Sequence, residues 1–121
     1  MSKDDTIYLR HILDAIRDIE NFTKGVSEEK FGCTKLLQDA VIRNLEIIGE
    51  ASKRVPKKIK DKHKDIEWKK IAGMRDVLIH DYLGVDVEIV WAVIENRLPE
   101  LKKKIAKILM RRKACLLKIQ K

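Results

Sequence analysis

Cysteine, proline and glycine are scarce in this sequence, whose 121 residues include two, two and five of them, respectively. Cys33 and Cys115 are 82 positions apart and lie in no Cys-x-x-Cys or Cys/His pattern, which speaks against a disulfide framework and a zinc site. Two free thiols in a reducing compartment are the simpler interpretation. His11, His63 and His80 form no i, i+4 pair of the kind that binds a metal on one helix face. We therefore expect neither a metal nor another cofactor.

Long apolar runs are also missing, since none approaches the roughly 20 residues of a membrane-spanning helix. Residues 1–5 carry early acids and no apolar segment of a signal peptide. We therefore expect a cytoplasmic location and no membrane partner. The length suits one domain and is too short for two. The 38% of charged and 45% of apolar residues are the balance of a helical globular protein, not of a disordered one.

Apolar residues recur at three- and four-residue steps, which predicts an all-α fold, an antiparallel bundle of four to five helices. The expected helices cover residues 4–24, ended by Gly25; 28 to about 53, capped by Ser27; 68 to about 83, stopped by Gly84; and a fourth that follows the cap Asp86 and is kinked or restarted at Pro99. Residues 56–64 are expected to connect two helices with a short helical turn. No segment alternates as a strand would, so no strand is expected. The helix over 28–53 is apolar around much of its circumference and needs more than one neighbour, which can include a second subunit.

Positive charge is concentrated at the C-terminus. The net charge is +8; residues 101–121 hold nine Lys and Arg and no acid, whereas residues 1–100 hold 18 basic against 19 acidic groups. We therefore divide the chain into a bundle, residues 1–101, and a basic amphipathic helical extension of the same domain, residues 102–121. Such a surface can attract a polyanion such as RNA, and the candidate contacts are Lys102, Lys103, Lys104, Arg111, Arg112 and Lys113. A solvated lysine-rich surface and docking on an anionic membrane are the alternatives.

The most informative segment, residues 74–82, places an Arg, a His and a Tyr within eight residues of an apolar helical pattern. Arg75 supplies a permanent planar cation that matches phosphate, and His80 can give or take a proton near neutral pH. Together they can hold, activate and protonate a phosphodiester without a metal. The spacing Arg75-x4-His80-x-Tyr82 resembles the signature of the HEPN-domain toxins, and in particular of the HepT-like family.

The flanking sequence resembles the same family. Residues 9–16 look like its first helix, residues 40–51 look like its second, and residues 68–74 lead into the signature as in that family. The resemblance thus covers roughly residues 7–101. One residue departs from the pattern, because Asp76 stands where relatives often have Asn.

The resemblance implies a metal-independent RNA endonuclease, the toxin of a type VII-like toxin–antitoxin pair, acting as a homodimer. In that mechanism His80 is the general base on the ribose 2′-hydroxyl or the general acid toward the leaving 5′-oxygen, and Arg75 neutralises the charge on the phosphorane. The implied products are a 2′,3′-cyclic phosphate and a 5′-hydroxyl. The implied partner is a minimal nucleotidyltransferase antitoxin, which transfers AMP to Tyr82 and so blocks the RNA cleft.

The helical spacing of these residues poses a geometric problem. On one ideal helix, Arg75 and Tyr82 point about 20° apart, whereas Arg75 and His80 point about 140° apart. Either the helix distorts or ends near Ile79, or a two-fold dimer brings two signatures to one cleft; the resemblance favours the dimer. Asp76 can orient His80 and raise its pKa, or it can pair with Arg75 and cancel part of its charge.

A different class of function is also compatible with these residues. The chain can be a non-catalytic helical module that binds and regulates a nucleotidyltransferase or binds nucleic acid, with Arg75 and His80 serving nucleotide binding or structure. Tyr82 can be a core or interface aromatic. The enzyme loses RNA cleavage in a His80→Ala variant, whereas the module cleaves no RNA in the first place.

Overall fold

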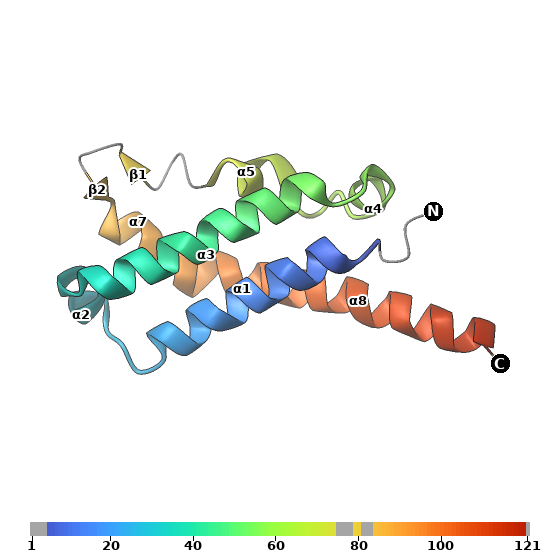
Figure 1. Ribbon diagram of the computed structural model, residues 1–121, viewed down its shortest axis with the longest axis horizontal. Helices are drawn as coiled ribbons and strands as arrows, with labels where there is room; N and C mark the ends of the chain where they lie inside the picture. The colour runs from blue at the N-terminus through green and yellow to red at the C-terminus, as the bar shows by residue number, and fades with distance from the viewer. Residues whose placement is uncertain (1–4, 75–78, 81–83, 121) are drawn as a thin grey trace.

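Three long helices form the body of the protein (Figure 1). They are α1 (Ile7–Thr23), α3 (Lys35–Arg54) and α8 (Leu98–Gln120). Helix α1 packs against both α3 and α8. The computed structural model describes residues 5–74, 79–80 and 84–120, and the side chains of residues 5–74 and 86–113. The predicted all-α class is confirmed.

Shorter elements connect and cover the long helices. They are α2 (Glu28–Cys33), α4 (Lys57–Lys62), α5 (Trp68–Ala72), α7 (Val87–Ala92), the π-helical turn η2 (Val93–Arg97), and the strands β1 (Ile79–His80) and β2 (Gly84–Val85). Helix α4 is the short turn expected in the connection. Helix α3 contacts α1, α2 and α5, so its broad apolar surface has several neighbours within one chain.

The core lies where the long helices meet. Its fully buried apolar side chains are Leu9, Ile12, Ile16 and Ile19 of α1, Phe31 of α2, Val41, Leu45 and Ile48 of α3, Ile59 of α4, Val90 of α7 and Ile105 of α8. Each such side chain stabilises the fold by about 1.5–3 kcal/mol relative to exposure. Within the described ranges, no helix is long and apolar enough to cross a membrane.

Three predicted helix ends are confirmed. Helix α1 ends at Thr23, and Gly25 follows with φ +72°, a conformation that side chains disfavour. The Ser27 side chain accepts a hydrogen bond from the Lys30 backbone N–H at 3.1 Å and so caps α2. The Asp86 carboxylate caps α7 in the same way, accepting from the Ile89 N–H at 3.3 Å.

The predicted single helix over residues 28–53 is wrong, because Thr34 divides it into α2 and α3. Its backbone is extended, with φ −118° and ψ 91°, and its hydroxyl donates to the Lys30 carbonyl at 2.7 Å. The Gln38 side-chain amide donates to the Phe31 carbonyl at 2.9 Å, so a carbonyl at the end of α2 keeps a partner. The break allows Phe31 to turn into the core, where its ring lies 5.3 Å from that of Trp91.

The predicted continuous helix over residues 68–83 is also wrong, because α5 ends early and Ile79–His80 form a strand. Helix α5 ends at Ala72, and β1 pairs antiparallel with β2, Ile79 opposite Val85 and His80 opposite Gly84. The expectation of no strands therefore fails at this ladder. Ile79 and Val85 are β-branched and favour extended backbone when paired across strands. The apolar residues Val77 and Leu78 precede Ile79 in the sequence. So short an apolar run is compatible with the periodicity of a helix and with that of a strand, so spacing alone does not distinguish the two.

The chain stays helical through Pro99, which resolves the choice between a kink and a restart. Helix α7 continues into η2, and the Leu98 N–H donates to the Val93 carbonyl five residues earlier, the π pattern. Pro99 has no N–H to donate and its ring disfavours a regular α turn before it. The wider turn accommodates the proline, and α8 follows directly.

Candidate active site

Helix α5 positions the segment that leads into the motif. It packs against α3 at Gly49, where an added Cβ would lie 3.2 Å from the Ala72 carbonyl oxygen. The Trp68 indole N–H donates to the His63 carbonyl at 3.1 Å and fixes the start of α5. Met74, at the end of this segment, is partly buried against the core. The backbone before the motif is therefore held by a close approach to Gly49 that a side chain at this position would disturb.

The four predicted motif residues differ in how far the structure describes them. His80 lies in β1, paired with Gly84, and its side chain is not among those described. Because its backbone is extended, the 140° separation calculated for a continuous helix does not apply to it. The helix has ended before Ile79, which is one of the two expected solutions. Arg75, Asp76 and Tyr82 lie outside the described residues, and their roles stay predictions.

A groove of about 600 Å³ opens beside the start of the motif segment, bounded by α5, α7, η2 and the first two turns of α8. Apolar side chains make much of its lining, namely Ile71, Met74, Ile89, Val93, Leu98 and Leu101. Charges of both signs surround them, from Asp65, Glu67, Lys69, Lys70, Arg97, Glu100 and Lys104. Lys70 lies 2.7 Å from Glu67 and, with the more distant Arg97 and Lys104, lowers the pKa of that carboxyl. The groove therefore carries an ionised acid among cations.

Sequence reasoning missed this groove, although a signal for it exists. Ile89 and Val93 lie four residues apart on a line that runs beside the buried positions Val90 and Trp91. Such a second apolar line beside a core stripe indicates a face that is only partly covered.

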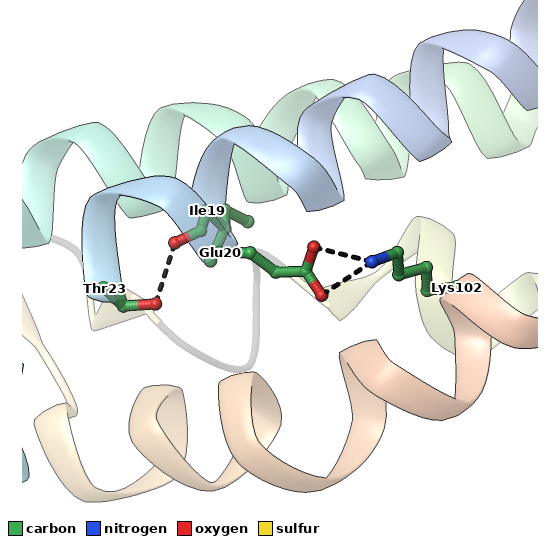
Figure 2. A network of polar contacts seen from close by, with 4 residues as sticks. All are labelled: Ile19, Glu20, Thr23 and Lys102. Carbon is green, nitrogen blue, oxygen red and sulfur yellow. Dashed lines mark hydrogen bonds and ion pairs between the residues drawn. The ribbon is translucent and has the colours of Figure 1, made fainter. Parts of the chain in front are cut away.

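The adjacent lysines 102–104 have different surroundings. Lys102 donates to both carboxylate oxygens of Glu20 at 2.9 and 3.2 Å, which ties α8 to α1. Figure 2 shows Glu20 reaching from α1 toward this lysine, beside Thr23, whose hydroxyl donates to the Ile19 carbonyl at 2.8 Å. Lys104 donates to the Asp65 carbonyl at 3.0 Å and lies 3.2 Å from Glu100. Lys103 is exposed.

The basic residues nearer the C-terminus divide in the same way. Arg112 is half-buried, with its guanidinium 3.7 Å from the Asp5 carboxylate. Lys58 of α4 lies 2.7 Å from the same carboxylate, which is 7% exposed. Lys58, with Arg112, lowers the pKa of Asp5. Arg111 and Lys113 are exposed. Of the six predicted RNA contacts, three thus bind acids of this chain and three face solvent.

Metal ligands are not grouped in the part of the chain that the structure describes. No cluster of three or more His, Cys, Asp or Glu side chains lies close enough together there to hold a metal ion.

The comparisons with known proteins identify the family. The model of the family described as "Ribonuclease HepT-like" matches residues 12–108, a span that includes the motif. A Thermococcus cleftensis protein named "Probable ribonuclease HepT" is 47% identical over 89% of this chain and 98% of its own length. A candidate RNase of Caldanaerobacter subterraneus subsp. tengcongensis is 46% identical over 88% of this chain and 95% of its own.

A longer relative shares the same region. A Methanocaldococcus jannaschii protein, whose name combines gamma-glutamylcyclotransferase with a candidate RNase, is 50% identical over 90% of this chain, which covers 49% of that protein. No solved structure matches the chain. The predicted family and enzyme class, a ribonuclease, are confirmed by these matches. The chain therefore belongs to the HepT-like ribonuclease family.

Proposed function

We propose that this protein is a metal-independent RNA endonuclease that acts as a homodimer and serves as the toxin of a HepT–nucleotidyltransferase pair. One observation carries the proposal, namely that Arg75, His80 and Tyr82 have the Arg-x4-His-x-Tyr spacing inside the span matched by the ribonuclease family. Two signatures meet in one cleft, so each subunit supplies part of the site. The resemblance to the family carries the dimer, because the extended backbone of His80 already removes the geometric conflict that one continuous helix would pose.

The proposed reaction uses the RNA's own 2′-hydroxyl. One His80 removes the hydroxyl proton, the 2′-oxygen bonds to phosphorus, and the bond from phosphorus to the 5′-oxygen breaks as the partner subunit's His80 delivers a proton to that oxygen. Arg75 stabilises the negative charge that builds on the phosphorane. The products are a 2′,3′-cyclic phosphate and a 5′-hydroxyl. Asp76 either orients His80 or pairs with Arg75.

Cleavage of mixed cellular RNA by the unmodified protein in excess EDTA tests this proposal. We expect fragments with 2′,3′-cyclic phosphate and 5′-hydroxyl ends, and no cleavage of DNA of the same sequence, because DNA lacks the nucleophile. Sedimentation of the same sample should give the mass of a dimer. A folded dimer that cleaves no RNA would contradict the proposal and indicate a non-catalytic partner module. A fully active monomer would contradict the composite site.

Tyr82 is the proposed acceptor of AMP from the antitoxin. An added adenylate brings bulk and negative charge to a site that holds phosphate, so we expect the modified protein to lose RNA cleavage. Intact-mass measurement after co-expression with the nucleotidyltransferase should show one or more added AMP units, and the Tyr82→Phe variant should show none. Tyr8→Phe, which leaves the motif unchanged, is the control. Equal modification of the wild type and Tyr82→Phe would place the acceptor elsewhere.

The contact between α3 and α5 is expected to control activity at a distance. In a Gly49→Ala variant the new methyl group meets the Ala72 carbonyl, so α5 must shift by a few tenths of an ångström. A misplacement of about 1 Å can cost about 100-fold in rate, and we therefore expect kcat/KM on RNA to fall by about tenfold.

Gly32→Ala is the matched control for this change. Its added Cβ would meet only Val87, at an ordinary 3.5 Å, and cleavage should be unchanged. Thermal unfolding followed by circular dichroism shows whether both variants fold. Equal activity in the two variants would indicate that the α5 position does not affect the site.

A further inference from the structure

Three cations form a line along the outer face of α8. Lys103, Lys107 and Arg111 are spaced four residues apart and are exposed, so successive side chains start about 6 Å apart along the helix axis. Among the residues with described side chains, none of the three has an acidic partner within ion-pair distance. We call these three residues the α8 stripe.

The basic residues beside the α8 stripe, Lys102, Lys104 and Arg112, form ion pairs within the protein. On a helix Lys102 and Lys104 point about 100° to either side of Lys103, and Arg112 points about 180° from it. Lys102 binds Glu20, Lys104 binds Asp65 and Glu100, and Arg112 approaches Asp5. These contacts fix the rotation of α8, which leaves the α8 stripe facing solvent. Charge that is fixed in position and free of local acids is available to an external anion.

We propose that the α8 stripe binds the phosphate backbone of the RNA that the protein cleaves, outside the cleft that holds the reacting bond. The proposal rests on the proposed ribonuclease function for the identity of the polyanion. Lys and Arg contacts to phosphates are independent of sequence, so the α8 stripe gives affinity and orientation, not base choice. The sequence predicted Lys102, Lys104 and Arg112 as RNA contacts together with Lys103. In this assignment these three residues stabilise the bundle and do not contact RNA.

The burial of the apolar face of α8 favours RNA over an anionic membrane. A helix that binds a bilayer surface inserts its apolar face into the lipid. Among the described side chains of α8, those up to Lys113, that face includes Leu101, Ile105 and Ile108, which are all buried in the core. Met110 is the one large apolar side chain of α8 that is exposed within the described residues, at 72%. An extended polyanion fits a line of cations without an apolar face.

RNA binding can be measured separately from RNA cleavage with a probe that the protein cannot cleave. The probe is a fluorescein-labelled, 2′-O-methylated single-stranded RNA of mixed sequence, whose blocked 2′-oxygen cannot act as the nucleophile. Fluorescence anisotropy is measured over a range of salt concentrations for the full chain and for the variant K103Q/K107Q/R111Q. The logarithm of the association constant falls as the logarithm of the salt concentration rises. Loss of three phosphate contacts should make this negative slope shallower by about 2 and should weaken binding by about 100-fold near 0.1 M salt.

The control variant R17Q/K24Q/K30Q removes the same charge from exposed residues of α1, of the turn that follows it and of α2. It should keep the slope and lose less than about threefold in affinity. Equal losses in the two triple variants would indicate a general charge effect and overturn the assignment, as would an unchanged slope in K103Q/K107Q/R111Q. Binding to phosphatidylserine vesicles that needs the stripe, with RNA binding unaffected, would overturn it in favour of a membrane.

The two proposals fail in distinguishable ways. If RNA binding needs the α8 stripe but the wild type cleaves no RNA, the RNA-binding role of the stripe is supported and the proposed ribonuclease function is contradicted. If the wild type cleaves RNA in EDTA and the stripe variant binds RNA with the affinity and salt dependence of the wild type, the ribonuclease function is supported and the RNA-binding role of the stripe is contradicted.

Discussion

A His80→Ala variant is expected to lose RNA cleavage by a factor of about 10²–10⁴, which is the usual contribution of a positioned general acid or base. The imidazole is the group in the motif whose proton exchanges near neutral pH, and alanine removes it without adding bulk. Single-turnover cleavage of a defined RNA in excess EDTA measures the loss. Folding should be unaffected, since β1, in which His80 lies, contains only two residues.

His11→Ala is the matched control for this experiment. His11 is exposed on α1 and touches the edge of Tyr8, with ring centroids 5.7 Å apart, and its loss should leave the cleavage rate unchanged. Arg75→Lys adds a second test, because lysine keeps the charge but not the two-pronged match to phosphate. Cleavage by His80→Ala at the rate of the wild type would remove this residue from the chemistry.

A Phe31→Ala variant is expected to lower the free energy of unfolding by about 3–5 kcal/mol, as for other buried aromatic side chains. Phe31 is fully buried and packs against Trp91, so the ring joins α2 to α7 through the core. Because small domains are stable by only about 5–15 kcal/mol, the variant should be partly unfolded at moderate temperature. Urea denaturation followed by circular dichroism gives the value.

Leu36→Ala provides the comparison on a neighbouring helix. The Leu36 side chain is 82% exposed, and its truncation should change the free energy of unfolding by less than about 0.5 kcal/mol. If the two variants unfold at similar urea concentrations, the break at Thr34 does not serve to bury Phe31.

Local signals were sufficient to predict several helix ends. Ser27 and Asp86 cap α2 and α7 through their own side chains, and Gly25 takes the positive φ that its position requires. Each of these depends on residues within three positions of one another, so the sequence contains the whole interaction. The motif was found in the same way, from the spacing of Arg75, His80 and Tyr82.

Other features could not be predicted because they depend on distant parts of the chain. The break at Thr34 depends on Phe31 reaching the core beside Trp91, 60 positions later. The division among Lys102, Lys103 and Lys104 depends on Glu20 in α1 and on Asp65 in the turn before α5. The groove beside the motif is likewise formed by α5 together with α7, η2 and α8. Helical periodicity reports one face of one segment and not which acid or apolar group will stand opposite it.

The wide turn before Pro99 holds an extra residue without changing which side of α8 faces the core. A π turn holds one more residue than an α turn, so removal of a single residue from Val93–Arg97 would restore an α turn and leave α8 at nearly the same rotation relative to α7. Removal of one residue from the regular part of α8 before Lys103 would instead rotate the following residues by about 100°, and Ile105 would leave the core. The wide turn is therefore a point at which the helix can change length while the same basic side chains stay exposed.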